Sequence, residues 1–285
     1  MTAVLGLVGS ARPWGNSEVL AREALAGAAE AGADALKLLR LTDLRLEPCT
    51  GCMVCALAGR VCPLDDDLNF LLDEVRQSDA LIIAAPTYFT GPTAQVKSIL
   101  DRFLILSSSE QWAQMPAKPA MTATVSGLES WRGVTVPLHN ALAQGLGGRL
   151  VGWMVCYATG PGEVLLQPDA LAHARDLGRR LVTGEPAAPP ENACPVCGAD
   201  FFHMEGTRMT CPICGQTGTL QAEGKTVAMR FDAPRSGGRW TPASLHKHME
   251  EWVIPSGARF MARRQEIKAA RARYDSLNVE WVRPS

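Results

Sequence analysis

Apolar runs alternate with amphipathic segments along the first two thirds of the chain. Residues 80–86, ALIIAAP, are continuously apolar, which is typical of a strand buried on both faces of a parallel sheet. Residues 65–78 begin with three aspartates, which suit a helix N-terminus, and then repeat leucine and valine at helical spacing. This alternation occurs five times, so it predicts an α/β fold with a five-stranded, doubly wound parallel sheet. The expected strands are 3–8, 35–41, 80–86, 119–127 and 149–158, and the expected helices are 18–32, 65–78, 93–106, 136–146 and 168–184.

A change of composition at residues 184–193 predicts a domain boundary. This segment, GEPAAPPENA, is too stiff and too polar to continue the preceding fold. The last part of the chain is expected to be helical from about Thr241 to Tyr274, with a break at residues 254–257, IPSG. The predicted units are an α/β domain (1–183), the linker (184–193), a small cysteine-containing module (194–232) with short strands at 218–222 and 226–231, and a helical C-terminal segment (233–285).

Charge and composition narrow the function classes. The 285 residues carry a net charge of -1, so no overall electrostatic field attracts nucleic acid or an anionic membrane. The N-terminus has no basic leader, and no apolar run reaches the eighteen or so residues of a membrane span. We therefore expect a cytoplasmic protein. Its nine cysteines are then expected to be metal ligands or reactive thiols, because the cytosol keeps thiols reduced.

Four cysteines lie close together in the segment after the second expected strand. Their spacing is Cys49-x2-Cys52-x2-Cys55-x6-Cys62, with a proline directly after the last. A disulfide pair, a zinc site and an iron-sulfur cluster are the alternatives. Zinc sites usually divide into two CxxC pairs, whereas a CxxCxxC run with a more distant fourth cysteine is typical of iron-sulfur ligation. The spacing favours a 4Fe–4S cluster over zinc, and both over a disulfide.

Four further cysteines form two matched CPxCG turns. Cys194 and Cys197 make the first turn, and Cys211 and Cys214 make the second after thirteen intervening residues. Each turn directs two thiolates toward one ion, so the pattern predicts a metal site. We expect structural zinc, because so small a module needs a metal to fold. Rubredoxin-type iron uses the same ligands and stays open as the alternative.

Polar and aromatic residues follow three of the expected strands. Ser10, Arg12, Asn16 and Ser17 lie in the loop that opens the first helix, where a phosphate would meet backbone N–H groups. The loop has neither GxGxxG nor a Walker lysine, so a mononucleotide fits better than a dinucleotide or a triphosphate. An ordinary strand-to-helix turn rich in capping residues is the alternative interpretation.

The other two loops suit a flat heteroaromatic ring. One loop supplies two aromatic side chains beside backbone donors, and another supplies a serine and a glycine. Loops that merely pack on their own domain are the alternative interpretation. The candidate ring contacts are Pro86, Thr87, Tyr88, Phe89, Ser126 and Gly127.

These motifs resemble the NADPH-dependent FMN reductase branch of the flavodoxin-like proteins. The resemblance rests on Ser10-x-Arg12-x-x-x-Asn16-Ser17, Pro86-x-Tyr88-Phe89 and Leu100-Asp101-Arg102, and it covers roughly residues 1–183. The inserted cysteine loop is similar, more specifically, to that of the iron-sulfur flavoproteins. The family implies FMN, with Ser10, Arg12, Asn16 and Ser17 at its phosphate, Pro86 to Phe89 beside its ring, and Ser126 and Gly127 on the other side. It also implies an oligomer in which the cluster faces the FMN of a neighbouring subunit.

The expected function is that of an FMN-dependent iron-sulfur oxidoreductase or electron carrier. Its donor would be ferredoxin or NAD(P)H, and it would form a homo-oligomer, a dimer or tetramer. No general acid or base is evident in the sequence, which fits chemistry that is carried by the cofactors. One alternative is an NAD(P)H-dependent FMN or quinone reductase without a cluster. The other is a redox sensor that binds nucleic acid through the cysteine-containing module (194–232) and the basic residues 259–273. The simpler interpretation of residues 259–273 is a solvated helix face.

Overall fold

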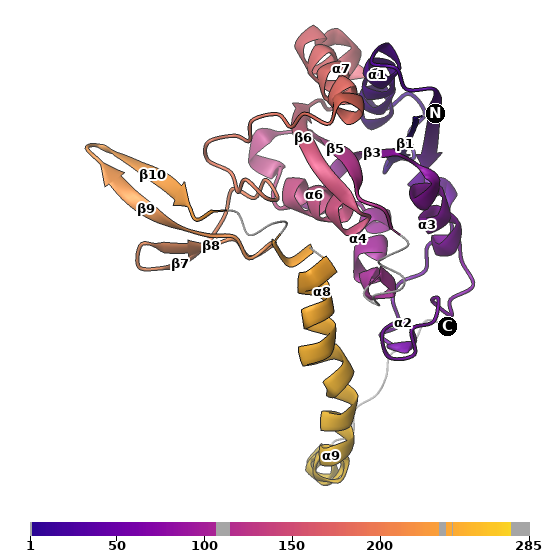
Figure 1. Cartoon of the computed structure of the whole chain (residues 1–285), viewed down its shortest axis with the longest axis vertical. Coiled ribbons are helices and arrows are strands. Elements are labelled where there is room, and N and C mark those ends of the chain that lie inside the picture. Colours follow the sequence, from indigo (N-terminus) through magenta and orange to yellow (C-terminus); the bar gives the residue numbers. More distant parts are fainter. Residues whose placement is uncertain (1, 107–114, 234–237, 241, 275–285) are drawn as a thin grey trace.

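A parallel sheet with helices on both faces occupies the first two thirds of the chain (Figure 1). The structure is a computed structural model that describes residues 2–106, 115–233, 238–240 and 242–274. The strand order is β2-β1-β3-β5-β6, and the two-residue strand β4 (Gly91–Pro92) pairs antiparallel with the end of β3. The five parallel strands are β1 (Ala3–Val8), β2 (Ala35–Arg40), β3 (Ala80–Tyr88), β5 (Lys118–Ser126) and β6 (Gly148–Tyr157). This order, with its reversal between β1 and β3, confirms the predicted fold class.

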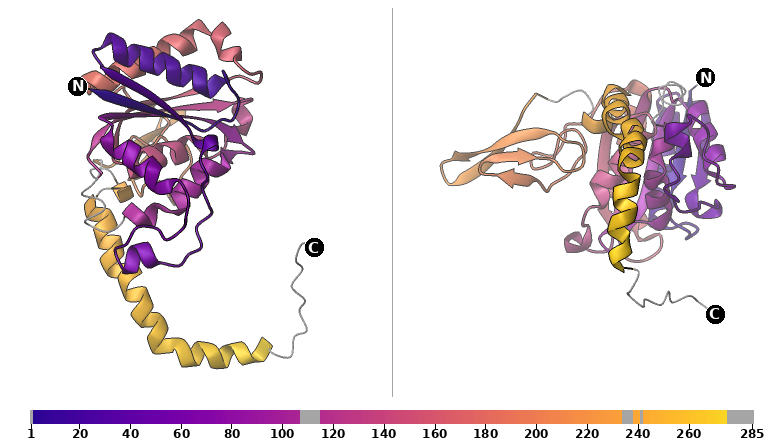
Figure 2. Two further views of the ribbon diagram at one scale, coloured as in Figure 1. Left: turned by 90° about the vertical axis from the view of Figure 1, so that its right-hand side faces the viewer. Right: turned by 90° about the horizontal axis from the view of Figure 1, so that it is seen from below.

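Two hydrophobic cores lie on opposite faces of the sheet. Alternate residues of a strand feed different cores, so Ile82 belongs to one and Ile83 to the other. The helices α1 (Asn16–Glu30) and α7 (Pro168–Thr183) cover the first face. The helices α3 (Leu68–Gln77), α4 (Ala94–Asp101) and α6 (Thr135–Gly145) cover the second, as Figure 2 shows. Short helical turns complete this part: η1 (Leu41–Asp43), α2 (Val54–Leu57), η2 (Phe103–Leu106), η3 (Glu129–Trp131) and η4 (Glu163–Leu166).

A four-stranded antiparallel sheet follows the first unit. Its order is β10-β9-β8-β7, and its two longer strands match the two predicted ones. The two shorter strands have three residues each, too few for a sequence pattern to reveal. The strands are β7 (His203–Glu205), β8 (Arg208–Thr210), β9 (Thr217–Glu223) and β10 (Thr226–Phe231). The backbone N–H of Ala187 donates to Val151 O at 2.7 Å, so the segment 184–193 lies along the edge strand β6, and the boundary there stays a prediction.

A long helical segment projects away from the rest of the chain (Figure 2). It comprises η5 (Gly238–Trp240), α8 (Pro242–His248), the π-helical turn η6 (Met249–Val253), α9 (Ile254–Arg271) and η7 (Ala272–Tyr274). The predicted break at 254–257 is wrong. η6 passes directly into α9, because Val253 at the junction has helical backbone angles (φ -72°, ψ -56°), and Pro255 is accommodated within this continuous helical run. Thr241 and residues 275–285 lie outside the described part of the chain. Among the described residues, no helix is both long enough and apolar enough to cross a bilayer.

Helices α1 and α7 approach each other at two glycines. A Cβ atom on Gly27 would lie 1.9 Å from Arg175 O, and one on Gly178 would lie 1.9 Å from Ala24 O. No side chain fits between the backbones at this crossing. The pair therefore sets the distance between the two helices that cover the first core.

Replacing Gly27 by alanine should destabilise the protein. The added methyl group would push α7 away, and overpacking of this kind costs about 1–3 kcal/mol in the free energy of unfolding. Gly257→Ala is the matched control, because nothing lies within 4 Å of a Cβ at that helical position. Thermal unfolding of both variants tests this, and equal melting temperatures would contradict the close contact.

Candidate functional site

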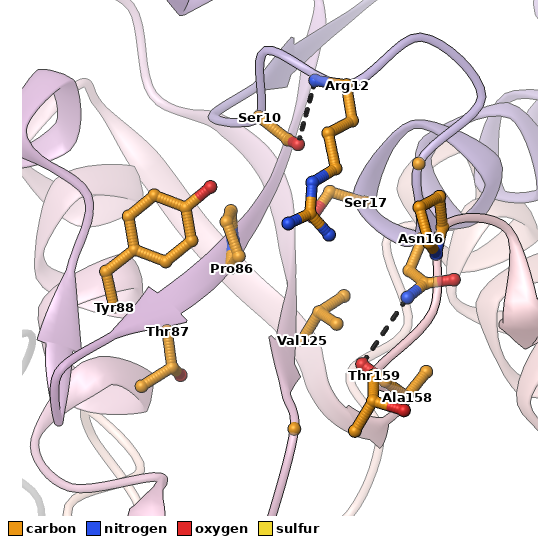
Figure 3. Close-up of a pocket in the computed structure, with 13 residues that line it drawn as sticks. Ser10, Arg12, Asn16, Ser17, Pro86, Thr87, Tyr88, Val125, Ala158 and Thr159 are labelled. Carbon is orange, nitrogen blue, oxygen red and sulfur yellow. Dashed lines mark hydrogen bonds between the residues drawn. The ribbon is translucent and has the colours of Figure 1, made fainter.

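A cavity of about 260 Å³ opens at the carboxyl ends of β1, β3, β5 and β6 (Figure 3). Its wall combines the loop before α1, the end of β3 and the segments that follow β5 and β6. Eight of the ten predicted cofactor contacts lie in this wall. The lining residues are Ser10, Arg12, Gly15, Asn16, Ser17, Pro86, Thr87, Tyr88, Val125, Gly127, Ala158, Thr159 and Pro161.

Two of the predicted contacts lie outside the wall. Phe89 is 89% exposed, and its ring meets the edge of Trp131 at 6.1 Å between centroids. Ser126 is buried, and its hydroxyl donates to Leu128 O at 2.9 Å. Conversely, the sequence prediction missed the loop after β6, although two glycines and a proline directly after a strand were a usable signal.

The first turn of α1 meets the cavity without a side-chain cap. Asn16 does not cap its own helix; its Nδ2 donates to Gly160 O at 2.9 Å, and its Oδ1 accepts from Val164 N at 3.1 Å. This side chain therefore ties the loop after β6 to the loop after β1. The positive end of the helix and the guanidinium of Arg12 remain at the cavity wall, an arrangement that suits a phosphate.

The opposite wall offers an unused polar atom. The hydroxyl of Thr87 is buried and has no hydrogen-bond partner in the described part of the chain. Pro86 and Tyr88 flank it in the same wall. A buried hydroxyl without a partner costs free energy, so this wall suits a ligand with both a flat apolar face and polar edge atoms.

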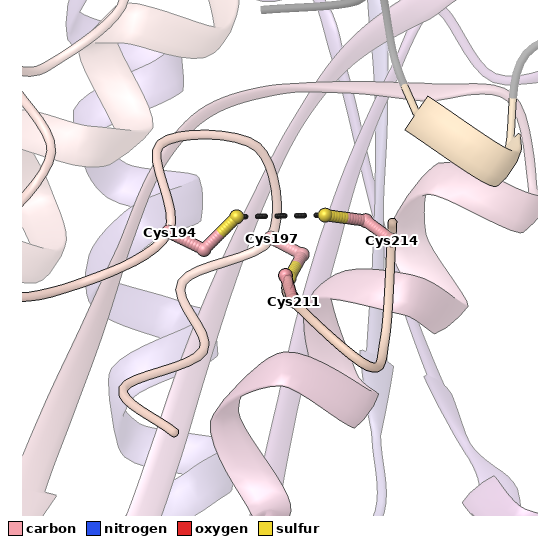
Figure 4. Close-up of side chains that lie close together, drawn as sticks. All are labelled: Cys194, Cys197, Cys211 and Cys214. Atoms are coloured by element: carbon pink, nitrogen blue, oxygen red, sulfur yellow. Dashed lines mark hydrogen bonds between the residues drawn. The ribbon is translucent and has the colours of Figure 1, made fainter. Parts of the chain in front are cut away.

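The four cysteines of the CPxCG turns converge in one site (Figure 4). All four are buried, and their sulfurs lie within 4.8 Å of one another. Gly198 and Gly215 directly follow the last cysteine of each turn. Their φ angles are +72° and +79°, which residues other than glycine rarely adopt. The two turns therefore have the same backbone form and present their sulfurs to one point.

Hydrogen bonding among these sulfurs lowers the pKa of Cys194 and Cys211 and raises the pKa of Cys197 and Cys214. Four thiolates cannot share so small a space without a cation. A tetrahedral zinc ion with bonds of about 2.3 Å requires sulfurs at this kind of separation, so the site fits a single metal ion.

The first cysteine set has a different arrangement. Cys49 and Cys52 are exposed, whereas Cys55 and Cys62 are half-buried against the second core. Among the described residues, the CPxCG cysteines are the only group of three or more His, Cys, Asp or Glu side chains that gathers closely enough to hold one metal ion, so the first set does not. Burial raises the pKa of Cys55, and charge on Cys62 and Cys52 raises it further, so these sulfurs still interact.

The backbone around this loop supplies donors to the sulfurs. The N–H of Val54, aided by the hydroxyl of Thr50, lowers the pKa of Cys52. The N–H of Ala56 acts on Cys55 in the same sense. Donors of this kind stabilise ligating thiolates and tune iron-sulfur clusters. The loop therefore fits a cluster held by several partly exposed sulfurs.

A buried ion pair fixes the ends of the cysteine loop. Arg102 pairs with Asp66, and both side chains are almost completely buried. Asp66 also accepts a hydrogen bond from Glu47 N at 2.8 Å. Burial of Arg102 lowers its pKa, but Asp66, with a smaller contribution from Cys62, outweighs this effect and raises the pKa. The residues before Cys49 and after Cys62 are thereby joined to the end of α4.

Comparison with known proteins agrees with these features. Residues 2–155 match the NADPH-dependent FMN reductase family. An iron-sulfur flavoprotein of Methanocaldococcus jannaschii is 41% identical over 99 residues, which cover 35% of this chain and 50% of that protein. An iron-sulfur flavoprotein of Archaeoglobus fulgidus is 29% identical over 183 residues, which cover 62% of this chain and 77% of that protein. The chain thus spans only half the length of the first of these relatives.

A solved flavone reductase has the same fold over the whole chain. It matches 99% of this chain and 100% of its own, with a TM-score of 0.79 and 20% identity. The antiparallel sheet and the C-terminal helices therefore belong to a fold already seen with this α/β unit. Since the family match covers more than half of the 285 residues, this protein belongs to the NADPH-dependent FMN reductase family of flavin-dependent oxidoreductases.

Proposed function

We propose that this protein is an FMN-dependent iron-sulfur oxidoreductase that passes electrons between FMN and a 4Fe–4S cluster. The observation that carries the proposal is the combination of two sites on one sheet. The cavity lies at the ends of β1, β3, β5 and β6, and the cysteine loop leaves the same end of the neighbouring strand β2. Relatives named iron-sulfur flavoproteins support the same combination.

The cavity would hold FMN. Its phosphate would meet the uncapped start of α1, with Ser10, Arg12, Asn16 and Ser17 around it. Its ring would lie against Pro86, Thr87, Tyr88 and Gly127, with Phe89 at the rim and Ser126 behind the wall. Bound FMN supplies both one-electron and two-electron chemistry. The chain's own residues bind and orient it, and Thr87 offers its unused hydroxyl to a polar ring edge.

Cys49, Cys52, Cys55 and Cys62 would hold the cluster. Thiolates around one zinc ion must lie close together, whereas those on a cube of iron and sulfide lie farther apart. The CxxCxxC run in a partly exposed loop, with N–H donors on Cys52 and Cys55, supports the cube. Cys194, Cys197, Cys211 and Cys214 would hold zinc as a structural ion. The protein would act as a homo-oligomer, with NAD(P)H or ferredoxin as its electron donor.

A second candidate is an FMN-dependent reductase of a flat organic molecule. The neighbour whose fold matches this chain throughout is named a flavone reductase. Exposed aromatic side chains close to the cavity, Tyr88, Phe89 and Trp131, would suit such a substrate. Turnover of flavone by NADPH in a variant that lacks all four loop cysteines would favour this function over electron transfer through a cluster.

Two matched cysteine variants should lose different metals. In Cys55→Ser we expect iron and sulfide to disappear while zinc stays; in Cys211→Ser we expect the reverse, because each change removes one thiolate from one site. Anaerobically purified wild type should contain about four irons and four sulfides per chain from the cluster and about one zinc ion per chain from the CPxCG site. Metal and sulfide analysis per chain is the measurement. Wild-type protein without acid-labile sulfide would refute the proposed cluster.

Arg12→Ala should weaken FMN binding. A hydrogen bond to a charged group contributes about 1.5–3 kcal/mol, so the dissociation constant should rise about tenfold or more. Titration of apoprotein by flavin fluorescence measures this. Arg76→Ala is the control, because Arg76 lies on α3, away from the cavity wall, and should leave affinity unchanged. Equal affinity in both variants would exclude Arg12 as a phosphate contact.

A further inference from the structure

The C-terminal helical segment touches the cysteine loop through two buried side chains. Met249 is 3% exposed and Val253 is 8% exposed, and they pack with Ala56, Met53 and Leu104. Met53 directly follows Cys52, and Ala56 directly follows Cys55. The contact therefore lies against the backbone that carries two of the four sulfurs.

The π-helical turn η6 makes this contact. Met249 and Val253 are its first and last residues, and both point toward the loop, whereas no described side chain of α9 is buried. Phe260 and Met261, on α9, are 53% and 59% exposed. Turns of this type are rare and frequently occur at functional sites. Contact with the body of the protein is thus concentrated where the helix crosses the cysteine loop.

The second CPxCG turn holds the first residues of this helical segment. Arg239 N donates to Cys214 O at 3.0 Å, and the Arg239 guanidinium donates to Pro212 O at 3.0 Å. Trp240 packs edge-on against Phe103 with 6.2 Å between ring centroids. The second CPxCG turn and the first unit therefore both hold the residues that lead into α8.

We propose that the C-terminal helical segment, anchored on the CPxCG turns, is a cover that shields the Cys55 side of the bound cluster from solvent and oxidants. This inference rests on the proposed cluster. The stability of an iron-sulfur cluster toward oxidation depends on its exposure, and an apolar layer also controls the access of water. The second core packs against Cys55 itself, Met249 and Val253 pack against the adjacent residue Ala56, and Cys49 is exposed.

The test compares Val253→Asp with Phe260→Asp in the full-length, anaerobically loaded protein. A carboxylate at Val253 would be buried against Ala56 and should release the cover, whereas one at Phe260 enters solvent. Bleaching of the cluster absorbance in air should become at least about tenfold faster in Val253→Asp. Phe260→Asp should bleach at the wild-type rate.

Hydrogen exchange provides a readout that does not depend on the cluster. Amides of residues 53–57 should exchange faster in Val253→Asp and in the milder Met249→Ala, while those of β3 stay protected, which shows that the sheet is folded. Equal bleaching and equal exchange in all variants, with iron present, would overturn the cover and leave the proposed function intact. Wild-type protein without iron would overturn both.

Discussion

The buried ion pair between Asp66 and Arg102 is the constraint on which the candidate redox loop depends. Removing one partner would leave an uncompensated charge in the protein interior, at a cost of about 3–5 kcal/mol. The carboxylate of Asp66 also accepts from Leu68 N at 3.3 Å, at the start of α3. One side chain thus connects both ends of the cysteine loop to two helices. The loop can then carry exposed thiols and a left-handed residue such as Met53, with φ of 62°, without losing its place.

The CPxCG turns depend on a second set of buried polar contacts. Asn140 on α6 donates to Cys197 O at 2.9 Å and accepts from the hydroxyl of Thr122, in the central part of β5, at 2.6 Å. Gln144, one helical turn later, donates to Val196 O at 2.7 Å. These buried hydrogen bonds give the metal module a fixed position on the α/β unit. Helix α6 therefore supports both the sheet that forms the cavity and the first CPxCG turn.

Periodicity along the chain predicted the parallel sheet because buried strands and amphipathic helices depend mainly on local pattern. Loop conformation depends on distant contacts, which the local sequence does not contain. Phe89 turns outward because it and Thr90 have φ of 48° and 65°, and Thr90 O accepts from Val134 N at 2.9 Å. The backbone at Gly133 leaves no room for a Cβ beside Thr90. Nothing in PTYFTG alone indicates this partner.

The two cysteine sets differ in how far the protein prepares them for metal. In each CPxCG turn a backbone hydrogen bond closes the knuckle, as from Gly198 N to Cys194 O at 2.8 Å, so the sulfurs gather by local structure. The loop from Cys49 to Cys62 has no paired knuckles; its sulfurs interact but remain apart. Binding of a single ion can then stabilise the folded form of the small module that carries the CPxCG turns. A cluster bound by the loop from Cys49 to Cys62 would instead order that loop as it binds. Such a loop exposes its sulfurs to solvent more than a preformed CPxCG turn does. Met249 and Val253 pack against this loop, where a cover would protect a bound cluster.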